Sequence, residues 1–252
     1  MNLVFASGVL VPQHILEFNY FRGVREVFPD ALFPEVPVTA SVDARAETMA
    51  ALIEARFPAG PIHVIAHSMG GLDTRCLLSR NLRGLGAPGR IASLSTISSP
   101  HRGSPIADLL VGANPDGPGL RPFVYQVLRH TFDALGVPLD ALGALTTGST
   151  AAFNKTHANV PHVRYVSYAG DRAESIALKP AHLYLESIGE TDDERANDGI
   201  VSVASAIWGE FVTPRWATDH FGELGYNLNS WPKLHSSFDH IAAFRDVVAR
   251  VT

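Results

Sequence analysis

The chain has 252 residues, of which 46% are hydrophobic and 18% are charged, and its formal net charge is −5 at pH 7. That length and composition suffice for one α/β domain with a sizeable core. The basic residues are scattered along the chain, so we expect no positive face for a phosphate backbone and no nucleic acid partner. No window approaches the roughly 18 consecutive apolar residues that a membrane-spanning helix needs.

The first apolar run, residues 2–6, predicts a strand that opens into a loop at Ser7 and Gly8. Loops that follow parallel strands gather at the carboxyl edge of the sheet, where ligand sites are usually built, so residues 9–20 are a candidate site wall. No basic segment precedes the run, which argues against a signal peptide, and the single cysteine, Cys76, excludes an internal disulfide. These features favour a cytoplasmic location, with secretion left open.

Apolar patterning predicts an alternation of strands and helices over most of the chain. Strands are expected at 36–39, 62–66, 91–97 and 163–168, and helices at 43–56, at 70–80 and from about residue 240 to the C-terminus. This alternation is typical of a mostly parallel sheet that helices cover on both faces.

A segment at about 104–160 interrupts the alternation. It begins with a Gly- and Pro-rich stretch, 112–119, and continues with helical patterns near 122–135 and 138–146. Insertions of this length inside a compact domain are usually functional. We interpret the segment as a helical cap with an apolar face that includes Phe123, and the sequence leaves open whether it moves as a lid or is fixed.

The pentad 66–70 is the most informative motif. It places Ser68 between a predicted buried strand and a predicted helix, with small residues on both sides, which is the pattern of a nucleophile elbow. Ala66 departs from the usual pattern, which has glycine there. Ser68 is therefore the candidate nucleophile, and the backbone N–H groups of Val9 and Met69 are the candidate oxyanion donors.

A serine hydroxyl needs a histidine to take its proton and a carboxylate to orient that histidine. In the order serine, acid, histidine, the candidates are Asp198, in an Asn-Asp-Gly turn, and His220, in a later loop. Asp171, which follows the predicted strand 163–168, is the rival acid. His240, near the start of the terminal helix, is the rival histidine.

With these residues in place, the chain resembles the bacterial triacylglycerol lipases of the α/β-hydrolase superfamily. The segments that carry the resemblance, in chain order, are 8–10, 20–24, 43–47, 67–75, 99–104, 197–201 and 219–221. The resemblance implies an α/β-hydrolase fold, with a mostly parallel central sheet, helices on both faces and a helical cap or lid insertion. It also implies that Ser68, Asp198 and His220 form a catalytic triad.

Two features of the secreted, calcium-binding members of that family are missing. Gly222 stands where they carry an aspartate ligand to calcium, and Tyr226 stands at a further ligand position. Ala204 stands where a cysteine of their disulfide is expected. Because Ca²⁺ takes 6–8 oxygen ligands and one carboxylate ligand is missing, we expect no structural calcium. We also expect no other metal and no cofactor.

The sequence thus predicts a serine carboxylic-ester hydrolase, a lipase or esterase that cleaves apolar acyl esters through an acyl-enzyme intermediate. Leu10, Ile106, Leu109 and Phe123 are expected to line the substrate pocket. The expected partner is a small-molecule or lipid ester, met at a lipid–water interface, and no protein partner is indicated. Two alternatives stay open: a polyester depolymerase or acyltransferase with the same triad, and a non-catalytic α/β-hydrolase-like binding module.

Overall fold

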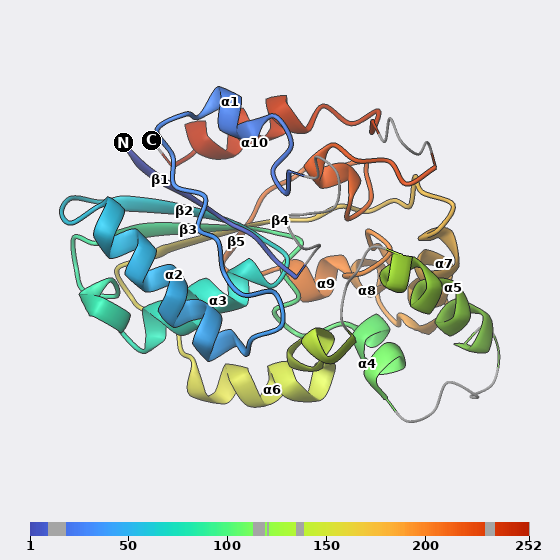
Figure 1. Cartoon of the computed structure of the whole chain (residues 1–252). Helices are drawn as coiled ribbons and strands as arrows, with labels where there is room; N and C mark the ends of the chain where they lie inside the picture. Colours follow the sequence, from blue (N-terminus) through green and yellow to red (C-terminus); the bar gives the residue numbers. More distant parts are fainter. Residues whose placement is uncertain (10–18, 113–118, 120, 135–138, 230–234, 252) are drawn as a thin grey trace.

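A computed structural model describes residues 1–9, 19–112, 119, 121–134, 139–229 and 235–251 (Figure 1). A central sheet contains β1 (Asn2–Ala6), β2 (Ile62–His67), β3 (Ile91–Ile97), β4 (Arg164–Tyr168) and β5 (Glu210–Phe211). The strands lie side by side in chain order and all neighbours pair parallel. The predicted parallel sheet is therefore confirmed, with strand bounds within one or two residues of those expected at 62–66, 91–97 and 163–168.

Helices cover both faces of the sheet, as Figure 1 shows. On one face, α2 (Val42–Arg56) packs against α3 (Gly70–Ser79), and on the other α1 (Val24–Val27) lies beside α10 (His240–Ala249). Because both faces are covered, β2 and β3 are almost entirely buried, which explains why neither strand carries a charged aspartate, glutamate, lysine or arginine. The core under α10 is aromatic: the ring of Phe5 lies 4.9 Å from that of Phe33 and 5.9 Å from that of Phe244.

The predicted strand at 36–39 is wrong, because these residues form no strand. The edge of the sheet is extended instead by an isolated bridge between Leu32 and Val4, in which the Leu32 N–H donates to the Leu3 carbonyl at 2.8 Å. Pro34 and Pro37 lack the N–H groups that a strand ladder needs, so the segment after Leu32 cannot continue the pairing.

The predicted cap lies beyond the carboxyl ends of the strands (Figure 1). It contains α4 (Pro105–Val111), α5 (Arg121–Ala134), the 3₁₀ segment η2 (Leu139–Leu145) and α6 (Thr147–Thr156). The helix predicted near 122–135 is confirmed over the described residues 122–134, whereas in the second predicted helix, near 138–146, residues 139–145 form a 3₁₀ segment rather than an α-helix. The sequence reading missed α4 and α6, although Ser104 and Thr146 are both N-cap residues whose side chains accept a backbone hydrogen bond.

The rest of the chain completes the carboxyl edge with short elements. These are α7 (Lys179–Ile188), α8 (Asp192–Arg195), α9 (Val203–Ala206) and the 3₁₀ segment η3 (Gly222–Leu224), while a further 3₁₀ segment, η1 (Leu82–Gly84), follows α3. Within the described ranges, no helix is long and apolar enough to cross a membrane.

Candidate active site

Ser68 occupies a strained turn between β2 and α3. Its φ is +57°, in the left-handed region that residues with a side chain rarely adopt, and only 6% of it is exposed. The turn is crowded: a Cβ at Gly70 would lie 2.5 Å from the Ala6 carbonyl oxygen, and one at Gly71 would lie 2.2 Å from Ser99 Oγ. Only glycine fits at these two positions, which is the backbone geometry that the elbow motif requires.

The structure brings the predicted acid and the predicted histidine together. His220 Nδ1 donates to Asp198 Oδ2 at 2.7 Å, and the other carboxylate oxygen accepts the backbone N–H groups of Ile200 at 2.8 Å and Val201 at 2.7 Å. Asp198 is fully buried and His220 is 3% exposed. A carboxylate on Nδ1 fixes the neutral ring with its proton there, so Nε2 presents a lone pair that can take a proton.

The histidine lies at the nucleophile end of β2. Its ring centroid is 4.6 Å from that of His67, the residue that precedes Ser68. Between the described residues no hydrogen bond joins Ser68 Oγ to the His220 ring. Catalytic hydrogen bonds are commonly long in unliganded enzymes and tighten when substrate binds.

The rival residues have other contacts. Asp171 is partly exposed and lies 3.7 Å from Arg172 Nε. His240 donates from Nε2 to the Arg22 carbonyl at 2.7 Å, at the beginning of α10. Neither of these contacts involves Asp198 or His220.

The loop after β1 lies against Ser68. A Cβ at Gly8 would lie 2.7 Å from Ser68 Cβ and 3.0 Å from Ser68 Oγ, so the loop backbone passes directly beside the hydroxyl. In the part of the chain that the structure describes, no hydrogen bond is donated by the backbone N–H of Val9 or Met69. Among the described residues, the two predicted oxyanion donors thus have no backbone acceptor.

A small apolar cavity of about 20 Å³ adjoins Ser68, room for roughly one water molecule. Its lining comes from the 100–107 segment, the cap and the turn after Asp198: Pro100, Ser104, Ile106, Ala107, Phe132, Leu142, Leu145, Ile200 and Val201.

Of the predicted pocket residues, Ile106 lines this cavity and Leu109 is buried in the core. Leu10 lies outside the described residues. Phe123 is 59% exposed and lines a separate surface pocket with Ile176 and Leu183. Phe132, Leu142 and Leu145 of the 104–160 segment also line the cavity and were not predicted, although all three belong to the apolar pattern of that segment.

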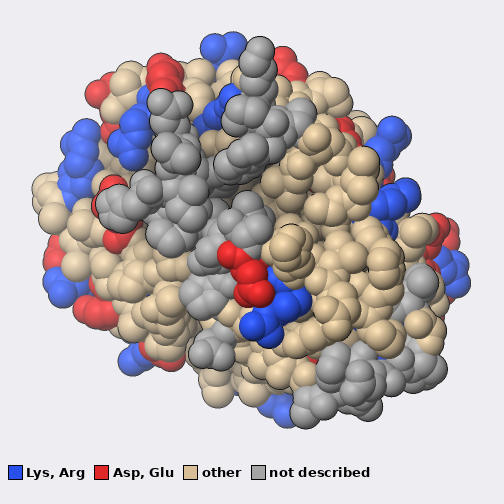
Figure 2. Space-filling view, turned by 45° about the vertical axis from the view of Figure 1, so that its right-hand side comes forward, with Lys and Arg blue, Asp and Glu red and all other residues tan. Residues whose placement is uncertain are grey.

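The described part of the surface around α4, α5 and α7 has few charges. Figure 2 shows a broad uncharged area there, with one cluster of acidic and basic side chains near its centre. Three of the exposed large apolar side chains, Phe123, Ile176 and Leu183, come together between α5 and α7.

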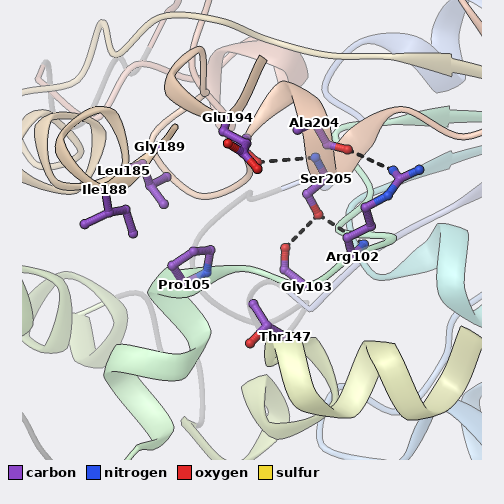
Figure 3. Close-up of a pocket in the computed structure, with 11 residues that line it drawn as sticks. Arg102, Gly103, Pro105, Thr147, Leu185, Ile188, Gly189, Glu194, Ala204 and Ser205 are labelled. Carbon is purple, nitrogen blue, oxygen red and sulfur yellow. Dashed lines mark hydrogen bonds between the residues drawn. The ribbon is translucent and has the colours of Figure 1, made fainter. Parts of the chain in front are cut away.

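A larger pocket of about 220 Å³ lies next to the N-terminus of α4 and is lined by residues of α7 and α9 (Figure 3). Its polar groups already have partners within the protein: Ser205 Oγ donates to the Gly103 carbonyl at 2.6 Å, and Arg102 Nη1 donates to the Ala204 carbonyl at 2.8 Å. Ser68 does not line it.

The positions that would hold calcium in the resembling lipases do not suit a calcium site here. A Cβ at Gly222 would lie 2.0 Å from Thr218 Oγ1 and 3.0 Å from Ser236 Oγ, which leaves no room for a carboxylate. Tyr226 donates its hydroxyl to the Asn19 carbonyl at 2.7 Å. The expectation that the protein holds no metal stays a prediction, tested below.

The sequence of this chain is similar to those of known proteins. No family model matches the sequence. Triacylglycerol lipase 2 of Saccharomyces cerevisiae is 30% identical to it over 242 residues, which cover 88% of this chain and 68% of that protein. The chain belongs to the triacylglycerol lipase family. Another such lipase, from Vibrio cholerae, is 26% identical to it over 267 residues, covering 94% of this chain and 82% of its own length.

Solved structures agree on the fold of this lipase-family protein. The mature form of a Bacillus licheniformis lipase matches it with a TM-score of 0.70 and 21% identity, over 99% of this chain and 91% of that one. A metagenomic carboxyl esterase matches with a TM-score of 0.73 and 22% identity, over 100% of this chain and 75% of its own. The predicted α/β-hydrolase fold is confirmed, and the protein is a carboxylic ester hydrolase of the lipase and esterase kind, as the sequence predicts.

Proposed function

We propose that this enzyme hydrolyses apolar acyl esters through an acyl-enzyme formed on Ser68. The observation that carries the proposal is the buried hydrogen bond between Asp198 and His220, at the same end of β2 as the strained Ser68 turn. This arrangement supports a triad of Ser68, His220 and Asp198, with the backbone N–H groups of Val9 and Met69 as its proposed oxyanion donors.

In the proposed reaction Ser68 Oγ attacks the ester carbonyl carbon while His220 Nε2 takes the hydroxyl proton. The N–H groups of Val9 and Met69 stabilise the resulting oxyanion, and Asp198 stabilises the imidazolium. Collapse of the tetrahedral intermediate breaks the bond to the alkoxy group, which leaves as an alcohol with the proton from His220. Water, deprotonated by the same imidazole, then attacks the acyl-enzyme, and the acid is released with Ser68 restored.

The substrate class follows from the cavity. Its lining is mainly apolar, which favours an acyl chain over a polar acid, and its present volume of about 20 Å³ is too small for such a chain. We infer that the protein is a single α/β-hydrolase domain whose 104–160 segment is a cap, and that Phe132, Leu142 and Leu145 shift to admit the chain. The weakly charged face around the cap supports an ester met at a lipid–water interface. A cytoplasmic location stays a prediction.

Hydrolysis of p-nitrophenyl esters from acetate to palmitate tests the proposal. The unmodified protein is compared with Ser68→Ala and with the control Ser79→Ala, whose hydroxyl donates within α3 to the Cys76 carbonyl. We expect turnover that Ser68→Ala abolishes and Ser79→Ala keeps, with the chain-length maximum separating a lipase from a short-chain esterase. Turnover that does not depend on Ser68 would overturn the triad, and no turnover on any ester would favour the binding-module alternative.

A further inference from the structure

Three side chains that the triad does not use, one partly buried and two fully buried, form a hydrogen-bonded row beside the loop that follows β1. The Tyr20 hydroxyl accepts the Gly8 N–H at 2.8 Å and lies 2.8 Å from His67 Nδ1, while His67 Nε2 lies 2.9 Å from Glu223 Oε2. His67 and Glu223 are both fully buried. The row thus links residue 223, after the histidine loop, to the backbone beside the nucleophile.

One proton arrangement that fits these contacts begins at Tyr20. Because the Tyr20 oxygen accepts from Gly8, its own proton is available for His67 Nδ1, and the neutral His67 ring then carries its proton on Nε2 and donates it to Glu223. Burial lowers the pKa of His67 well below its usual range and raises the pKa of Tyr20, so both keep the neutral forms that this arrangement needs.

Glu223 is itself held in place. Its Oε1 accepts the Gly170 N–H at 2.9 Å and the Ser98 hydroxyl at 2.5 Å. The row therefore ends on an anchored carboxyl group, whose pKa burial and the nearby Asp198 raise well above its usual range. Because its position is fixed, this group fixes the ring of His67 and, through it, the direction of the Tyr20 hydroxyl.

The opposite side of the loop is held by a buried guanidinium. Arg45 Nη2 donates to the Ser7 carbonyl at 2.9 Å and to the Gly8 carbonyl at 3.3 Å, and the same side chain is paired with Asp73 at 2.8 Å. In a trans peptide the C=O and N–H point in opposite directions. The Ser7–Gly8 peptide is thus held at its oxygen by Arg45 and at its N–H by Tyr20, and the next peptide turns the Val9 N–H away from Arg45.

We propose that Tyr20, backed by His67 and Glu223, is a positioning residue that fixes the Ser7–Gly8 peptide and so aims the Val9 N–H at the ester oxyanion. The inference rests on the proposed function, because it concerns an oxyanion formed at Ser68. Tyr20 acts through the loop backbone, since its hydroxyl is already engaged by Gly8 and His67.

The test is Tyr20→Phe, which keeps the ring beside Phe21 and His67 and removes only the hydroxyl. The matched control is Tyr165→Phe, because the Tyr165 hydroxyl also accepts one backbone N–H, that of Val160 at 2.9 Å, at the start of β4. Both variants leave one backbone donor without its partner, so a general loss of stability is common to both.

Two kinetic quantities separate positioning from stability: the kcat and KM of a p-nitrophenyl ester, and the inhibition constant of an alkyl trifluoromethyl ketone, which forms an oxyanion when Ser68 adds to it. Removing an oxyanion donor costs about 100-fold or more in kcat, so a misaimed donor should cost about 10- to 100-fold. We expect that loss for Tyr20→Phe, with little change in KM and a similar loss of ketone affinity. For Tyr165→Phe we expect both quantities within about 2-fold of the unmodified enzyme.

A second variant keeps the inference testable if Tyr20→Phe folds poorly. His67→Phe removes both ring nitrogens at similar volume, and it should lower kcat and ketone affinity together. Combining it with Tyr20→Phe should add little, because both act through the same hydroxyl. Equal kinetics for Tyr20→Phe and Tyr165→Phe would overturn the inference, and so would additive losses in the double variant. In either case the loss of ester turnover in Ser68→Ala would still support the proposed function. If the ester assay shows no Ser68-dependent turnover, the proposed function itself fails and the inference fails with it.

Discussion

Asp198 and His220 are 22 residues apart in the chain, yet the carboxylate accepts the imidazole N–H at 2.7 Å in a site from which water is almost excluded. A second bond, from the His220 backbone N–H to the Asp198 carbonyl at 3.1 Å, ties the two loops together independently of the side chains. Removing the charge of the carboxylate should therefore alter the imidazole without displacing the loops.

Asp198→Asn should lower kcat by about 1,000- to 10,000-fold, because an amide can donate to His220 and stabilise the wrong tautomer. Steady-state hydrolysis of a p-nitrophenyl ester measures this. Asp171→Asn is the matched control, since Asp171 is the acid that the sequence alone leaves as a rival, and its rate should stay within about 2-fold of the unmodified enzyme. A large loss for Asp171→Asn and a small one for Asp198→Asn would exchange the two roles.

Ile106 lines the cavity beside Ser68, so a larger side chain there should shorten the acyl chain that the enzyme accepts. Ile106→Phe should shift the maximum of the chain-length profile toward acetate and butyrate, and overpacking should destabilise the fold by about 1–3 kcal/mol. Phe123→Ala should leave the profile unchanged, because Phe123 lines a different pocket. An altered profile for Phe123→Ala would restore that residue to the substrate site.

His101 should make the protein less stable in mild acid. It is fully buried, and burial, with Arg75 and Arg102 nearby, lowers its pKa well below the usual value of 6.5. Just below pH 6.5, His101 therefore binds a proton in the unfolded chain but not in the folded protein. This contribution to stability is complete above that pH and is lost as the pH falls, at up to about 1.4 kcal/mol per pH unit.

The carboxyl groups of Asp73, Asp219 and Glu223 have raised pKa values and act in the opposite direction, so the effect of His101 is measured by difference. His101→Gln should cost about 1.4 kcal/mol less at pH 5.5 than at pH 7.5, as judged by urea unfolding at both pH values. A cost that does not change with pH would mean that the His101 ring takes up a proton in the folded protein.

Removing calcium should leave the protein unchanged. Excess EDTA followed by added Ca²⁺ should shift the midpoint of thermal unfolding in neither step, because Gly222 leaves no room for the ligand that a calcium site would need. A lower midpoint with EDTA that Ca²⁺ reverses would show a structural calcium ion bound elsewhere.

The sequence predicted best what depends on local patterns. Mainly apolar and small residues identified β2 and β3, and the small residues on both sides of Ser68 indicated the crowded turn around it. The strand predicted at 36–39 does not form. The prediction relied on the apolar residues there and gave too little weight to Pro34 and Pro37, which lack the N–H groups that a sheet needs.

What the sequence could not supply depends on contacts between distant segments. Nothing near Glu223 marks it as the partner of His67, 156 residues earlier, and the elbow motif that contains His67 does not indicate a partner for its side chain. The apolar pattern of the cap was visible, but only the packing of α5 and η2 shows that Phe132 and Leu142 reach the cavity while Phe123 points to the surface.

The most direct test of the account is covalent labelling by a p-nitrophenyl alkylphosphonate, followed by mass spectrometry of the intact protein and its peptides. An activated serine releases p-nitrophenol and keeps the phosphonyl group, whereas an ordinary hydroxyl does not react. A catalytic triad at Ser68 predicts one adduct per chain, located on Ser68 and absent from Ser68→Ala. No adduct, or an adduct that persists in Ser68→Ala, would contradict it.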